Sequence, residues 1–162
     1  MNNSKVLFKS VFASMLVCAA GFATAADNQN LTVNAVVNGV CKFTTSAQTL
    51  SFGTIDPSAV GPLSASGATV SYKCTKDTTG AAVTFGDGLN STGVGARQMK
   101  LGATTNVLPY TLSATGGGVT GTGFGTGSIA SSLTFNSQIT AANYANLPAG
   151  TYTDTVLMSI SP

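Results

Sequence analysis

Short runs of alternating apolar and polar residues indicate that this chain is a β-protein. The first run is LTVNAVV at residues 31–37, and one of its faces carries Leu31, Val33, Ala35 and Val37. A period of two is that of a strand with one buried face. No short turn joins this run to a later strand. It therefore either pairs within its own domain or leaves that domain and completes a neighbour.

Similar runs follow along the chain, separated by segments rich in glycine, proline and serine. Strands are predicted at residues 68–74, 81–85, 108–113, 132–139 and 151–161, with a shorter apolar-alternating run around Leu50, Phe52 and Ile55. In the last strand, Tyr152, Asp154, Val156, Met158 and Ile160 share one side. Residues 57–67 and the glycine-dense residues 114–128 are predicted to be loops, and residues 147–150 a turn. Short strands at this spacing, with no amphipathic helix among them, predict an all-β sandwich.

The first 25 residues have the pattern of a secretory signal peptide. Lys5 and Lys9 precede an apolar run at residues 11–23, and ATA at residues 23–25 is a small-x-small cleavage site. The apolar run is shorter than the roughly 20 residues that a membrane-spanning helix needs. We therefore expect an exported protein that has no membrane insertion after the signal is removed.

Charge and composition exclude several function classes. Two of the seven basic residues lie in the signal, so the mature chain balances five bases against five acids. Without a basic patch, nucleic-acid binding has no electrostatic basis. The chain also lacks histidine and glutamate, which are the usual general bases. We therefore expect no enzymatic activity, no catalytic residues, no cofactor and no metal site.

Two cysteines remain after the signal is removed, Cys41 and Cys74. An even number of cysteines in an exported chain predicts a disulfide bond. A reactive thiol pair is the alternative, but the CxxC spacing that favours it is missing, and neither cysteine has a basic neighbour on both sides.

Some motifs allow a second interpretation. GGGVTG at residues 116–121 matches the dinucleotide fingerprint in letters, but no helix follows it. DGLN at residues 87–90 has one carboxylate, which suits a tight turn better than a calcium site. Arg97 is either a ligand contact or a rim residue whose stem covers the end of the sandwich. The four tyrosines either form a sugar-stacking platform or belong mostly to the core and its rim.

Several segments together resemble the spore coat protein U domain family, the pilin-like family of archaic chaperone–usher pili. They are Cys41 near the mature N-terminus, LSFGTI at residues 50–55, ATVSYKC at 68–74, ARQMK at 96–100, LPYTL at 108–112 and LPAGTYTDTVLMSI at 147–160. The closing segment and the paired cysteines are the most specific of these. The signal pattern and the resemblance together divide the chain into a signal peptide at residues 1–25, a donor or first-strand segment at 26–40 and a β-sandwich domain at 41–162.

The resemblance implies an incomplete immunoglobulin-like sandwich that lacks one strand and leaves a hydrophobic groove. A periplasmic chaperone would fill this groove first, and the N-terminal segment of the next subunit would then replace the chaperone at an outer-membrane usher. This exchange is a form of β-strand addition. It implies an identical or related subunit as partner and a surface fimbrium that supports adhesion and biofilm.

Our hypothesis is therefore a pilus subunit that polymerises by donor-strand exchange. The donor residues are expected to be Leu31, Val33, Ala35 and Val37. The edge of the acceptor groove is expected to be Tyr152, Val156, Met158 and Ile160. The alternatives are a spore or cell-surface coat protein that forms no filament, and a lectin-like module that binds through the glycine-rich loop and the tyrosines.

Overall fold

The computed structural model describes residues 26–118 and 120–162, so the predicted signal peptide lies outside the described residues. The chain divides into two units, residues 1–35 and 36–162. In the first unit, residues 26–35 are exposed and have no regular secondary structure. The second unit holds all the strands described below.

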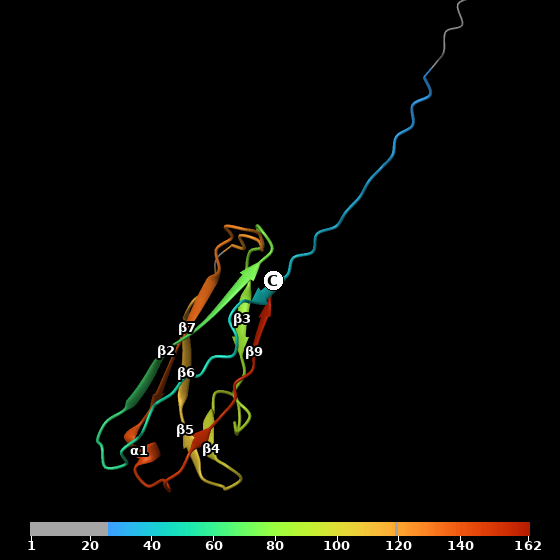
Figure 1. Ribbon diagram of the computed structural model, residues 1–162. Helices are drawn as coiled ribbons and strands as arrows, with labels where there is room; N and C mark the ends of the chain where they lie inside the picture. Colours follow the sequence, from blue (N-terminus) through green and yellow to red (C-terminus); the bar gives the residue numbers. More distant parts are fainter. Residues whose placement is uncertain (1–25, 119) are drawn as a thin grey trace, which may run out of the picture. The chain divides into compact units, whose positions relative to one another are not determined.

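The regular secondary structure of the described residues is almost entirely β, which confirms the predicted fold class (Figure 1). The elements are β1 (Cys41–Phe43), β2 (Leu63–Cys74), β3 (Ala82–Phe85), β4 (Gln98–Leu101), β5 (Val107–Pro109), β6 (Thr111–Gly116), β7 (Ser131–Ile139), α1 (Ala141–Tyr144), β8 (Tyr152–Thr153) and β9 (Met158–Ser161). Within the same residues, no helix has the length and apolar character needed to cross a membrane.

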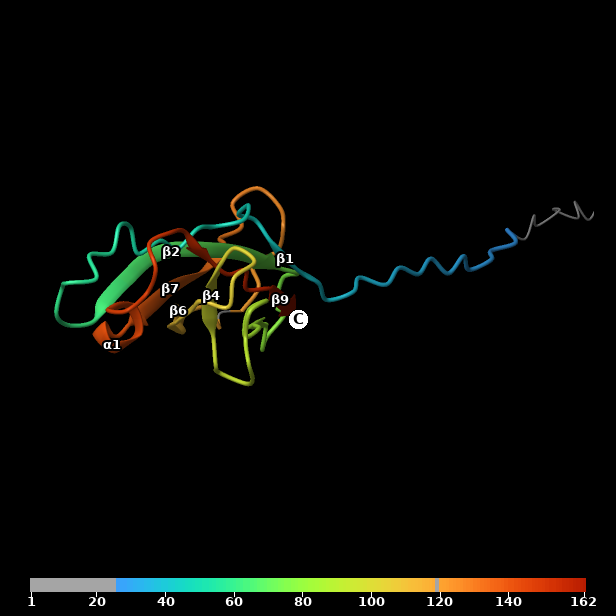
Figure 2. The ribbon, with the colours of Figure 1, turned by 90° about the horizontal axis from the view of Figure 1, so that it is seen from below.

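All strand pairings are antiparallel and form three sheets. The largest sheet has the order β1-β2-β7-β6, and β2, β7 and β6 lie next to one another in two perpendicular views (Figures 1 and 2). The two smaller sheets are β3-β9 and β5-β4-β8. The predicted disulfide is present: Cys41 and Cys74 are directly opposite each other on β1 and β2, with a Cα–Cα distance of 4.1 Å.

Strand β2 is longer than the sequence pattern predicted, because it begins at Leu63 inside the expected loop of residues 57–67. The pairing with β7 shifts register between Ser66 and Ala68, and Gly67 has a φ of +98°. Such a bulge inserts one residue, so the inward face changes from odd to even positions. Ala65 before the bulge and Val70 after it are therefore both buried. Because of the bulge, residues 63–74 do not alternate strictly, and the sequence pattern therefore did not predict the first part of β2.

The predicted single strand at residues 108–113 is two strands that belong to different sheets. Residues of β5 pair with β4, whereas β6 pairs with β7. The change occurs at Tyr110, whose N–H donates to the carbonyl oxygen of Arg97 at 3.1 Å. Local alternation cannot reveal such a change of sheet, because the run continues through it unaltered.

The predicted last strand at residues 151–161 is likewise interrupted, into β8 and β9. Its sidedness holds through the interruption: the predicted inward side is half-buried and the opposite side is exposed. The intervening backbone bonds to the loop after β3 instead of to a regular strand. The N–H of Leu89 donates to the carbonyl oxygen of Thr155 at 3.1 Å.

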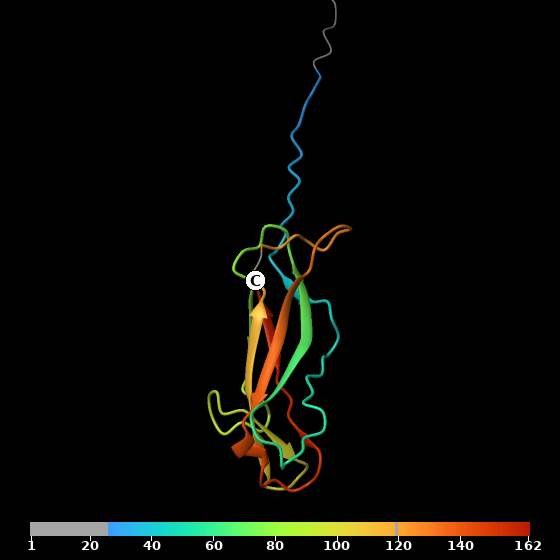
Figure 3. The same ribbon diagram turned by 90° about the vertical axis from the view of Figure 1, so that its left-hand side faces the viewer.

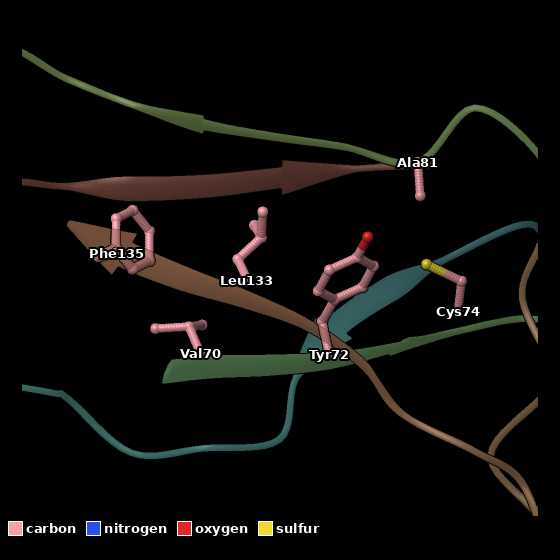
Figure 4. Close-up of a cluster of buried hydrophobic side chains, with 6 residues drawn as sticks. All are labelled: Val70, Tyr72, Cys74, Ala81, Leu133 and Phe135. Atoms are coloured by element: carbon pink, nitrogen blue, oxygen red, sulfur yellow. The ribbon is translucent and has the colours of Figure 1, made fainter. Parts of the chain in front are cut away.

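The main core lies between the β2–β7 layer and the β3–β9 layer (Figure 4). The buried side chains there are Val70, Tyr72, Cys74, Ala81, Leu133 and Phe135. Phe135 meets Phe85 edge to face, with ring centroids 5.6 Å apart. A second buried cluster of Leu108, Ile139 and Tyr144 receives Phe52 and Ile55. The LSFGTI run therefore packs against the body without being a strand.

Most of the glycine-dense segment is a loop, as predicted, but its first residues are not. Residues 114–116 belong to β6. Further along, Gly121 donates from its N–H to Thr78 and accepts from the N–H of Asp77, both at 2.8 Å, and the N–H of Gly123 donates to Cys74 at 2.9 Å. These bonds hold the loop against the end of β2, the long green strand of Figure 3.

Candidate strand-binding groove

An apolar hollow of about 450 Å³ lies between the segment after β1 and the segment leading into β9. Its lining is mostly hydrophobic and consists of Phe43, Thr45, Ser46, Ala47, Val70, Leu89, Thr155, Val156, Leu157 and Met158. Val70 belongs to the main core. The hollow therefore opens directly onto the interior of the sandwich.

On one side of the hollow, alternate backbone groups of the last strand lack a neighbouring strand. The carbonyl oxygens of Thr155 and Leu157 accept hydrogen bonds from the N–H groups of Leu89 and Gly86. The backbone N–H and carbonyl groups of the odd-numbered residues therefore point toward β3 and its loop. Because successive residues of a strand direct their backbone groups to opposite edges, Val156, Met158 and Ile160 face the other way. Among the described residues β9 pairs with β3 alone.

The other side of the hollow has a matching edge. The N–H of Thr44 donates to the carbonyl oxygen of Ser71 at 2.8 Å, and the carbonyl oxygen of Val40 accepts from the N–H of Thr75 at 2.9 Å. The backbone N–H and carbonyl groups of the even-numbered residues in this segment therefore point toward β2, and those of odd-numbered residues such as Phe43 point away from it. In its sheet β1 is the outermost strand. Two edges with unused backbone groups thus border one apolar hollow.

The predicted groove residues lie at different distances from this hollow. Val156 and Met158 line it. Ile160 packs with Met158 against the main core. Tyr152 belongs to the second cluster, where its hydroxyl donates to the carbonyl oxygen of Pro148 at 3.0 Å. The sequence pattern put all of them on one side of the last strand, but it did not show that the strand passes over two separate clusters.

Sequence reasoning missed the lining residues that come from elsewhere in the chain. Phe43 and Ala47 follow the first cysteine, and Leu89 lies in the loop after β3. Leu89 and Leu157 are 81% and 75% exposed, although both are large and apolar. One of these residues, Phe43, could have been predicted from the sequence, because it lies two positions after Cys41 and shares its side of an alternating strand.

The predicted donor residues are exposed and lie outside any strand. Leu31 is 88% exposed and Val33 is 82% exposed, and Val37 is also exposed. Ala35 is exposed as well. In a chain with many polar residues, such a run of solvent-exposed aliphatic side chains requires an explanation.

Asp154 organises the interruption between β8 and β9. Its Oδ2 accepts from the Tyr110 hydroxyl at 2.7 Å, and its Oδ1 accepts from the backbone N–H and the Nδ2 of Asn90 at 3.2 and 3.1 Å. A side chain at position 88 would collide with this carboxylate, and Gly88 has a φ of +94°. Burial first, and the bond to Asp154 second, raise the pKa of Tyr110.

We expect the Tyr110→Phe variant to be less sensitive to alkali than the wild type. Since the folded-state pKa of Tyr110 lies above the unfolded-state value, its contribution to stability is complete below about pH 10 and declines as the pH rises toward the folded-state value. At neutral pH the variant should lose about 1.5 to 3 kcal/mol, because a bond to a charged acceptor is removed. Urea denaturation at pH 7 to 11 measures both effects. A parallel decline of the two proteins above pH 10 would contradict the expectation.

Arg97 is held by contacts inside the domain. Its guanidinium lies 3.2 Å from the Asp87 carboxylate and 5.5 Å from the centre of the Phe85 ring, and it donates to the carbonyl oxygen of Gly86 at 2.9 Å. These contacts close the loop between β3 and β4. They support the structural interpretation of Arg97, and they place the DGLN segment in this loop.

The tyrosines do not form a platform on the surface. Tyr72 and Tyr144 are buried, and the Tyr144 hydroxyl donates to the carbonyl oxygen of Gly61 at 2.7 Å. Tyr110 and Tyr152 are half-buried and have the partners described above. This arrangement leaves the lectin-like alternative without the stacking surface that it requires.

An antiparallel all-β domain with one disulfide and an apolar hollow between two strand edges is consistent with a pilin-like fold. The chain belongs to the Spore Coat Protein U domain family, whose model matches residues 27–159. It is similar to "Protein U" of Myxococcus xanthus, with 33% identity over 179 aligned positions that cover 99% of each chain. The resemblance seen in the sequence is thereby confirmed. The family is a structural, pilin-type family.

Proposed function

We propose that this protein is a subunit of a surface pilus, in which residues 31–37 of one copy complete the groove of the next. The observation that carries the proposal is the hollow between β1 and β9, which has unused backbone edges on both sides. An inserted strand pairs with both edges and covers the hollow with alternate side chains. Uncovered, the same edges are an aggregation hazard.

The dimensions and chemistry of the donor segment fit this groove. A strand of about seven residues spans roughly 23 Å, which is comparable to the edge that runs from Asp154 to Ser161. Burial of each large aliphatic donor residue contributes about 1.5 to 3 kcal/mol before the cost of ordering the segment. Of the alternate positions, Thr32 and Asn34 are polar, as suits a solvent-facing side, whereas Val36 is apolar.

Family membership supports the remaining assignments of the proposal. A periplasmic chaperone holds the groove before assembly, an outer-membrane usher exports the subunits, and the fibre supports adhesion and biofilm at the cell surface. The second candidate is a coat protein that forms no filament. The family description, with its reference to a spore coat, favours it as the alternative. Electron microscopy of the producing cells with an antibody against this chain separates thin fibres from a continuous layer.

A matched pair of groove variants tests the proposal. Val156→Asp places a charge on the lining of the hollow, whereas Ser159→Asp places the same charge on the exposed side of β9. We expect Val156→Asp to lose SDS-resistant ladders and Ser159→Asp to keep them, because only the first variant buries a charge beside the donor strand. Circular dichroism of the two purified variants, without the chaperone, verifies that both are folded. Equal ladders from both variants would exclude this groove as the acceptor.

A further inference from the structure

The Thr75 side chain holds the segment from which the donor residues depart. Its Oγ1 accepts from the N–H of Val40 at 3.0 Å and donates to the carbonyl oxygen of Asn38 at 3.2 Å. The N–H of Thr75 also donates to the carbonyl oxygen of Val40. Three hydrogen bonds from one residue thus fix residues 38–40 alongside the end of β2.

The sequence of this segment favours a different conformation. Although the sequence pattern predicted no short turn after residues 31–37, Asn38-Gly39 lies between this alternating run and β1, and an Asn-Gly pair between two such runs is the strongest short-range signal for a β-hairpin. A hairpin here would fold residues 31–37 back along β1 of the same subunit. The donor segment would then compete for the groove of its own chain.

The register of that hairpin does not fit the groove. A two-residue turn at Asn38-Gly39 places Val37 opposite Val40, and hence Ala35 opposite Lys42 and Val33 opposite Thr44. Lys42 and Thr44 are exposed. Directly opposite residues share a face, so the apolar donor residues would point into solvent, since a slip by one position reverses every side chain.

The backbone leads to the same conclusion. In the two-residue hairpin, the N–H and carbonyl of Val40 must both bond to Val37. In the structure both groups are already bonded to Thr75. The unused backbone groups of β1 are those of its odd-numbered residues, and this hairpin would not form hydrogen bonds with them.

A loop that is one residue longer would correct the register. With Asn38, Gly39 and Val40 all in the turn, Val37 lies opposite Cys41 and Ala35 lies opposite Phe43, which are half-buried. The last residue of such a loop adopts a left-handed conformation, and a β-branched residue rarely does so. Val40 would also have to leave Thr75. Two local features therefore oppose this three-residue hairpin.

We propose that Val40 and Thr75 determine the specificity of the groove for the tail of a second copy, because they prevent the chain from closing on itself. The inference rests on the proposed function. Exchange between subunits and self-closure would use the same donor residues. Val40 and Thr75 would therefore decide which of the two occurs.

The test is the double variant Val40→Gly with Thr75→Val, in the mature full-length chain released from its chaperone. Glycine permits the left-handed residue and valine removes the hydroxyl. We expect ladder formation to be at least about tenfold slower and a compact monomer to accumulate on size exclusion. The matched control is Val94→Gly with Thr78→Val, which makes the same changes at a fully exposed loop residue and next to the clamp, and should polymerise like the wild type.

A third variant verifies that the monomer is self-closed. Adding Val33→Asp to the double variant should convert the compact monomer into an open, aggregation-prone one, because the same donor face is used within the chain. If the double variant polymerises at the wild-type rate and yields no compact monomer, the inference is wrong while the proposed function stands. If the wild type itself stays a stable monomer without ladders, the proposed function fails.

Discussion

Val33→Asp should abolish polymer formation while leaving the chaperone complex intact. Val33 lies at the middle of the alternating donor face, which is exposed in the free chain. Insertion into the groove of another copy would bury the new carboxylate without a partner, at a cost of about 3 kcal/mol or more, which is roughly a hundredfold in affinity. SDS-resistant ladders, followed after the chaperone is removed, measure the effect.

Asn34→Asp is the matched control for this prediction. It adds the same charge one residue further along, on the face that stays in solvent when the strand is inserted. It should therefore form ladders close to those of the wild type. Persistent ladders from Val33→Asp, or an equal loss in both variants, would refute the donor assignment.

Mixing two variants provides a stricter form of the same experiment. Val33→Asp keeps an intact groove but cannot donate, and Val156→Asp keeps an intact donor but cannot accept. Together they should form one heterodimer, in which the tail of the Val156→Asp chain occupies the groove of the Val33→Asp chain, and no longer species. Dimers of the expected composition would be detected by mass spectrometry.

Removal of the disulfide should have the second large effect. Cys41 and Cys74 close a loop of 33 residues, for which the chain-entropy model gives about 3 to 4 kcal/mol of stabilisation. The variant Cys41→Ala with Cys74→Ala should lose about this free energy of unfolding. Urea denaturation in the Val33→Asp background measures the loss without interference from polymerisation.

The disulfide loss should also weaken the groove. β1 is a short strand at the edge of its sheet, and the disulfide joins its first residue to the buried end of β2. Without this bond, the edge next to the hollow should open and the yield of ladders should fall. A variant with unchanged stability and unchanged ladders would show that the backbone pairing of β1 with β2 suffices on its own.

The sequence predicted those features that depend on local pattern. The inward side of the last strand, the all-β class and the pairing of Cys41 with Cys74 all follow from alternation and from the small number of possible partners. Family membership was recognisable because LSFGTI and the closing segment keep their residues in order. The sequence did not predict the start of β2, because the bulge at Gly67 reverses the alternation on which the prediction depends.

The groove is the clearest case of what only the tertiary structure decided. Phe43, Leu89 and Val156 are distant in sequence and line one hollow, and no periodicity within a single segment predicts such a meeting. The sequence by itself determined which side chains of each strand face inward, because this depends on a period of two within the segment. The tertiary structure decided which edges stay unpaired, because an edge is defined by the strand that lies beside it.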